Sequence, residues 1–138
     1  MSHDAFEVWE DPKGVARFHF AHAGKDFTTG VLTLKPDAEL PRHNRPHAEE
    51  NLLQISGACQ ITLYGEDGAL QASYKLYPGM HLKMKQGQWH VHANPFEEES
   101  VTQFKAVGDI SEVVANVRDT FTPVFRTHPK KSRTALCC

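Results

Sequence analysis

The sequence has little of what marks several large classes of protein. Its three cysteines, of which Cys137 and Cys138 are adjacent, do not make a disulfide framework. No run approaches the roughly 18 uncharged apolar residues that cross a membrane, and Asp4 lies where a secretory signal would carry bases. The net charge is −2, so there is no excess of positive charge to attract a polyanion. We therefore expect a cytoplasmic protein with no nucleic-acid or membrane partner.

The composition is that of a folded domain. Apolar residues make up 40% of the 138 positions and charged residues 23%, which allows a core to be buried. We expect a single domain over 1–138, with a barrel core at about 15–107, a helix at about 111–119 and a basic tail at 121–138. The unusual count is that of histidine, which occurs nine times.

Short apolar segments separated by turns recur every 8 to 12 residues or so, which is typical of a sandwich or barrel. Asp67-Gly68 supplies a hairpin turn, and Ser111 can cap the one expected helix. We predict an all-β fold with a short C-terminal helix. The expected strands are 15–20, 27–34, 51–56, 59–64, 70–76, 82–84, 88–94 and 101–107, with Phe6–Trp9 as an edge strand.

Two spaced motifs are more specific than this pattern. The segment from Gly79 to Asn94, with Gly87 and His90 between them, resembles the second sequence motif of the cupin superfamily, although Lys85 stands where that family prefers proline. Glu50 and Gly57, which have six residues between them, match the end of the family's first motif. The resemblance covers roughly 28–107.

This resemblance implies a double-stranded β-helix, or jelly-roll barrel, that binds one divalent transition metal and a small-molecule ligand. In the family, two histidines and a glutamate from the first motif and a histidine from the second hold the metal. Imidazole and carboxylate suit Fe, Mn, Ni, Cu or Zn. The implied reactions are dioxygenase-like oxygenation and isomerisation of a small oxygenated molecule, and the implied assembly is a homodimer.

The first motif is out of register with the family pattern. Counting back from Glu50, the two histidine positions fall on Asn44 and Pro46, whereas the histidines are His43 and His47. Either a bulge brings His47 into the cavity beside Glu50, or the strand period places a different set on the inner face. That set is His43, Arg45, His47 and Glu49. The candidate metal ligands are His90, His47, Glu50 and His43, and a third alternative is a site without metal.

Other polar residues could complete the site. His92 shares a strand face with His90 and is the candidate general acid–base. Arg42 and Arg45 could hold an anionic substrate or be solvated loop charges. Gln54 could line the cavity, or face solvent if the strand parity is reversed. Two further functions stay open: a non-catalytic small-molecule-binding or sensing protein, and a metal-free enzyme resembling the sugar isomerases of the family.

Overall fold

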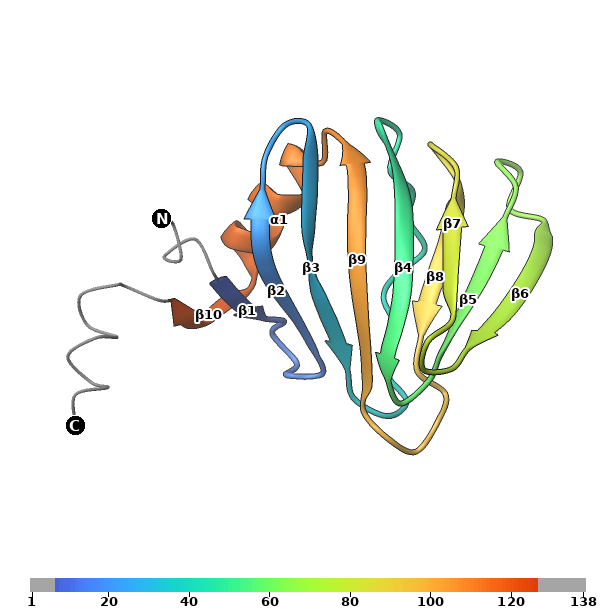
Figure 1. Cartoon of the computed structure of the whole chain (residues 1–138), viewed down its shortest axis with the longest axis horizontal. Coiled ribbons are helices and arrows are strands. Elements are labelled where there is room, and N and C mark those ends of the chain that lie inside the picture. Colours follow the sequence, from blue (N-terminus) through green and yellow to red (C-terminus); the bar gives the residue numbers. More distant parts are fainter. Residues whose placement is uncertain (1–6, 127–138) are drawn as a thin grey trace.

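The computed structural model describes residues 7–126, which form ten strands and one helix (Figure 1). The elements in chain order are β1 (Glu7–Glu10), β2 (Ala16–Ala23), β3 (Phe27–Leu34), β4 (Ala48–Ser56), β5 (Cys59–Tyr64), β6 (Leu70–Leu76), β7 (His81–Met84), β8 (Trp89–Ala93), β9 (Ser100–Gly108), α1 (Ser111–Thr120) and β10 (Thr122–Arg126). The expected all-β fold with a short C-terminal helix is confirmed. Within the described part of the chain, no helix is long and apolar enough to cross a membrane.

The strands form two antiparallel sheets. The larger has the order β10-β1-β2-β3-β9-β4-β7, and the smaller has the order β6-β5-β8. Strands distant in sequence pair in the larger sheet, since β9 lies between β3 and β4. This crossed connectivity is that of a jelly roll, in which inward-facing side chains from distant segments share one interior.

Alternation along the strands decides what reaches that interior. In β4 the buried residues are Ala48, Glu50, Leu52 and Gln54, and in β9 they are Ser100, Thr102, Phe104 and Ala106. The register sets Glu50 opposite Ala106 and Leu52 opposite Phe104. Because side chains of a strand alternate between faces, the inner face of the sheet presents both polar and apolar groups.

The apolar end of the interior is aromatic. The rings of Phe18 and Phe20 on β2 stack with their centroids 5.9 Å apart, and Phe104 meets both edge-on. Helix α1 buries Val114 and Val117 at this end of the fold. Ser111 is not its N-cap as expected, because the helix begins at this residue. The Asp109 carboxylate instead accepts a hydrogen bond from the Ser111 backbone N–H.

The glycines of the two motifs have a backbone role. Gly57, in the turn between β4 and β5, has a φ of 63°, and Gly79 has a φ of 89°. Residues with a Cβ rarely adopt this left-handed conformation, and a Cβ on Gly57 would also collide with the backbone carbonyl of Glu99. The glycines of the two motifs therefore mark two turns, one before β5 and one before β7.

One expectation about the ends of the chain is corrected, and the structure adds detail to a second. β1 is not an edge strand, because β10 pairs with it, bringing Val8 opposite Phe125 and Glu10 opposite Thr122. The first residues of the expected tail at 121–138 are thus part of the larger sheet, where they satisfy backbone groups that β1 would otherwise leave open. The remainder, 127–138, lies outside the described residues.

Candidate metal centre

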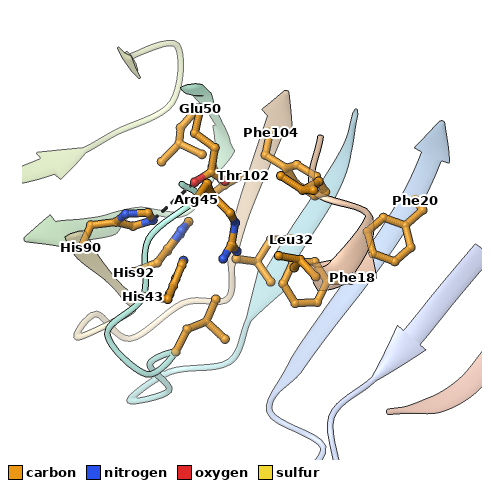
Figure 2. A pocket seen from close by; sticks show the side chains of 14 residues that line it. Phe18, Phe20, Leu32, His43, Arg45, Glu50, His90, His92, Thr102 and Phe104 are labelled. Atoms are coloured by element: carbon orange, nitrogen blue, oxygen red, sulfur yellow. Dashed lines mark ion pairs between the residues drawn. The ribbon is translucent and has the colours of Figure 1, made fainter. Parts of the chain in front are cut away.

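A cavity lies inside the barrel, between the larger sheet and β8, and has a polar end and an apolar end (Figure 2). Six polar residues line it: His43, Arg45, Glu50, His90, His92 and Thr102. Eight apolar residues complete the lining: Phe18, Phe20, Leu32, Leu40, Leu52, Phe104, Ile110 and Val113. The free volume is about 20 Å³, which is enough for an ion or one to two water molecules.

Glu50 supplies the carboxylate that lines this cavity. It is buried on the inner face of β4, and its Oε1 atom has no hydrogen-bond partner. Its neighbour Glu49 points to the opposite face, where its Oε2 lies 3.6 Å from the ammonium of Lys83. The register that the sequence left open is therefore the one with Glu50 inward.

His90 faces Glu50 from the other sheet. Its Nδ1 lies 2.9 Å from the backbone carbonyl oxygen of Gln88. Because a carbonyl oxygen can only accept, this ring nitrogen carries the proton. The other ring nitrogen, Nε2, lies 3.4 Å from Oε1 of Glu50, the contact drawn as a dashed line in Figure 2. The lone pair of the neutral ring is thus on the side of the carboxylate.

His43 is held beside His90 by the backbone. The two residues form an isolated antiparallel bridge with N–H to carbonyl distances of 3.0 and 2.9 Å, and their ring centroids lie 4.3 Å apart. Nδ1 of His43 donates to the carbonyl of Pro41 over 2.7 Å. Ligand atoms of His43, Glu50 and His90 lie within 4.8 Å of one another, so the three residues could hold a metal ion.

Burial keeps both imidazoles neutral. It lowers the pKa of His43 to about 3, with the positive charge of Arg45 acting in the same direction. Burial also lowers the pKa of His90, although the carboxylate of Glu50 opposes this shift. A neutral imidazole with Nδ1–H bound to a carbonyl offers Nε2 as a ligand, which is the usual arrangement at metal sites in proteins.

His47 is not part of this cluster. Pro46 and His47 form a turn before β4, in which the Ala48 N–H donates to the carbonyl of Arg45, and the side chain of His47 is exposed. This turn adds one residue to the expected spacing. The two inward side chains that precede Glu50 are consequently His43 and Arg45. The grouping of His47 with Glu50 is corrected, and Arg45 stands at the position of the second histidine in the family's first motif.

Arg45 and Arg42 have different surroundings. Arg45 lines the cavity, and its Nε atom is buried without a hydrogen-bond partner. Burial lowers the pKa of its guanidinium, with Glu50 opposing the shift. The guanidinium of Arg42 is instead outside the cavity, with Cζ 5.5 Å from the ring centroid of Tyr64 and 5.8 Å from that of Trp89. Of the two arginines expected to bind an anion, the structure brings Arg45 to the site.

His92 lines the same cavity as His90. It is buried, its Nε2 has no hydrogen-bond partner, and burial together with nearby His90 lowers its pKa to about 3. Figure 2 shows its ring on the same side of the cavity as those of His90 and His43. The strand alternation that placed it on the face of His90 is thus seen in the structure, while its role as general acid–base stays a prediction.

Gln54 is inward, but its side chain is used within the core. Its amide nitrogen donates to Ser100 Oγ over 3.0 Å, and its oxygen accepts from the hydroxyl of Thr102 over 2.7 Å and from the thiol of Cys59. It does not line the cavity, so its expected contact with a ligand is corrected. These partners come from β5 and β9, and nothing in the local sequence indicates them.

Sequence reasoning missed the apolar wall and Thr102. The inward alternation of Phe18 and Phe20 on β2 was a usable signal, as was the helical spacing from Ile110 to Val113. What the sequence did not indicate is that these two segments, about 90 positions apart, meet at one cavity. That meeting depends on the place of α1 beside β2 and β3.

Comparison with known proteins identifies the fold. No protein-family model and no curated protein sequence matches the chain. Solved structures do match: oxalate oxidase in complex with glycolate, with a TM-score of 0.55, 17% identity and coverage of 60% of this chain and 42% of that chain. A structure of Bacillus subtilis oxalate decarboxylase, from work on its Mn(II) centres, matches with a TM-score of 0.61 and 20% identity. The match covers 69% of this chain and 26% of that chain. The cupin domain of Schizosaccharomyces pombe Cnp3 matches with a TM-score of 0.60 and 15% identity, over 72% of this chain and 66% of that chain.

The chain spans less than half of the oxalate oxidase and about a quarter of the oxalate decarboxylase. At these identities the similarity is one of fold.

Proposed function

We propose that this chain, which has the cupin-type fold, holds one divalent transition metal through His43, Glu50 and His90 and acts on a small oxygenated molecule by oxygenation or isomerisation. Two imidazoles and one carboxylate that leave coordination positions open are the donor set of non-haem Fe(II) oxygenases. Fe(II) is therefore the metal that this set favours, with Mn(II), Ni(II), Cu(II) and Zn(II) as competitors.

The observation that carries the proposal is the contact between His90 and Glu50. With the proton of His90 on Nδ1, its Nε2 lone pair faces Oε1 of Glu50, which has no other partner. Two buried acceptors opposite each other repel, and a buried polar atom without a partner is unfavourable by about 1 to 3 kcal/mol. A cation between them turns both contacts into favourable ones, and Nε2 of the neutral His43 can complete the set.

The remaining polar groups have defined tasks in this proposal. The carbonyls of Pro41 and Gln88 orient the two imidazoles. Arg45 binds the negatively charged end of the substrate, and Nε2 of His92, which has no partner within the protein, forms a hydrogen bond with the substrate. The aromatic wall excludes water from the reacting atoms. A bound metal would act as a Lewis acid on a substrate oxygen or would activate O₂.

One observation favours a second candidate, a metal-free or non-catalytic anion-binding protein. Arg45 places a positive charge where the family motif has a histidine, and this charge disfavours a second cation in the same cavity. Among the described residues, the carboxylate of Glu50 forms no ion pair with Arg45 that would neutralise this charge.

The two candidates differ in whether a metal with open positions is present. Nitric oxide, added without oxygen to the Fe(II)-loaded protein, binds an open position and gives an electron paramagnetic resonance signal. We expect this signal in the wild type and in His81→Ala, an exposed histidine of β7, and its loss in His90→Ala. Loaded protein that gives no signal would contradict catalysis at this metal.

A further inference from the structure

We infer that the ligand of this cavity is a carboxylate monoanion with a short apolar chain. The inference rests on the proposed function for the location of the ligand, but it concerns two other parts of the cavity. These are the guanidinium of Arg45 and the apolar wall formed by Phe18, Leu32, Leu40, Ile110 and Val113.

The charge of the ligand follows from Arg45. The ionisable side chains that line the cavity are Arg45, Glu50 and three histidines, and Arg45 is the one that always carries a positive charge. Arg45 has no ion pair among the described residues, and its one hydrogen bond, from Nη1 to the Asn44 carbonyl, is long at 3.5 Å. Its buried Nε is still free to donate. A carboxylate would both neutralise the charge of Arg45 and accept from its free Nε–H, because a carboxylate accepts two parallel hydrogen bonds from a guanidinium.

The metal strengthens this preference. A divalent cation and Arg45 together carry three positive charges, and Glu50 supplies one negative charge, so the loaded site is left with an excess of positive charge. A neutral ligand would leave that excess buried. An anionic ligand reduces it, and the low local dielectric increases the benefit.

The other end of the ligand follows from the wall. In Figure 2, Phe18 and Leu32 lie on the side of Arg45 away from His90, and Phe104 and Phe20 continue this surface. None of these side chains offers a hydrogen-bond donor. A second carboxylate directed here would be buried without a partner, which is strongly unfavourable, whereas methyl and methylene groups are stabilised by leaving water. Because the free volume of about 20 Å³ is that of one to two water molecules, the chain must be short, and its entry requires the apolar side chains to move apart.

The test compares three compounds of similar size: butyrate, succinate and butyramide. Isothermal titration calorimetry is carried out on the Mn(II)-loaded and metal-free wild type. We expect butyrate to bind the loaded protein at least about tenfold more tightly than the other two. Arg45→Gln should lose at least about tenfold in butyrate affinity, and Arg42→Gln, whose guanidinium stacks outside the cavity, should lose none.

A second variant tests the apolar wall. Val113 is half-buried on α1, so Val113→Lys can bring an ammonium to the wall at little risk to folding. We expect this variant to favour succinate over butyrate. Circular dichroism establishes that each variant is folded.

The outcomes separate the inference from the proposed function. Equal or tighter binding of succinate by the wild type, or full butyrate affinity in folded Arg45→Gln, would overturn the inference even if the metal binds. Selective butyrate binding that depends on Arg45 in a protein that takes up no metal would support the inference and overturn the proposed metal function.

Discussion

Nε2 of His90 lies 3.4 Å from Oε1 of Glu50, and the Nδ1–H of the same ring is held by the Gln88 carbonyl. The histidine belongs to β8 of the smaller sheet and the glutamate to β4 of the larger one, so this contact joins the two sheets across the barrel. Because both facing atoms are acceptors, they repel each other, and a cation between them would relieve this repulsion. Binding of a metal should therefore also stabilise the fold.

Metal should raise the free energy of unfolding, and Glu50 should be needed for this effect. At a free metal concentration about 100 times the Kd, the expected gain is about 2.7 kcal/mol. Differential scanning calorimetry with and without Mn(II) measures it. Glu50→Gln should abolish the gain, while Glu49→Gln, which changes an outward carboxylate next to it, should retain it. If both variants lost the metal-induced gain equally, Glu50 would not be the one inward carboxylate that binds the metal, and the account would be contradicted.

The two histidines of the first motif should differ in their effect on metal affinity. His43→Ala removes a group whose ligand atom lies within 4.8 Å of those of Glu50 and His90, and we expect an affinity loss of at least about 100-fold. His47→Ala changes an exposed turn residue and should leave the affinity unchanged. Competition with a chromophoric chelator gives both Kd values. A larger loss of affinity in His47→Ala than in His43→Ala would show that His47, and not His43, binds the metal together with Glu50.

The metal-free protein should lose stability as the pH falls from about 6.5 toward 3. In the folded chain burial holds the pKa values of His43 and His92 at about 3, whereas in the unfolded chain these groups titrate near 6.5. Between these values the unfolded state binds more protons, so acid favours unfolding, by up to about 1.4 kcal/mol per pH unit for each histidine.

Urea titrations at a series of pH values isolate this effect through the variant His92→Gln. Its free energy of unfolding should fall less steeply with decreasing pH than that of the wild type. The exposed control His81→Gln should follow the wild type. Parallel curves for His92→Gln and the wild type would show that His92 is not held neutral by burial.

Gln54→Leu should destabilise the fold and leave metal binding intact. The amide of Gln54 connects Ser100, Thr102 and Cys59 between β4, β5 and β9. Its loss leaves buried hydroxyls without a partner, with an expected cost of about 1 to 3 kcal/mol. Chemical denaturation measures the cost, and metal titration of the folded variant supplies the control. A stable variant that has lost the metal would instead return Gln54 to the site.

The sequence predicted the fold through local patterns. Strand alternation, the hairpin at Asp67-Gly68 and the motif glycines each depend on a few neighbouring residues, and the jelly roll with a short helix is confirmed. The pairing of β10 with β1 was not predictable in this way, because it joins residues more than 100 positions apart.

The site was only partly predictable for the same reason. His90 and His92 lie on a regular strand, so their shared face followed from alternation. The segment before β4 is irregular, and the turn at Pro46 and His47 shifts the inward positions by one residue. What fixes His43 inside is its backbone bridge to His90, a contact between segments 47 positions apart that no local pattern encodes.

The most direct test of the proposed metal centre is the metal content of the protein itself. Chain purified without a chelating column is stripped with a chelator, reloaded with Fe(II) without oxygen, passed through a desalting column and analysed by mass spectrometry for bound metal. We predict about one metal ion per chain for the wild type and for His81→Ala, and less than roughly a tenth for His90→Ala. A wild type that retains less than roughly a tenth of an equivalent after reloading with Fe(II), Mn(II), Ni(II) or Zn(II), or a His90→Ala variant that retains a full equivalent, would contradict it.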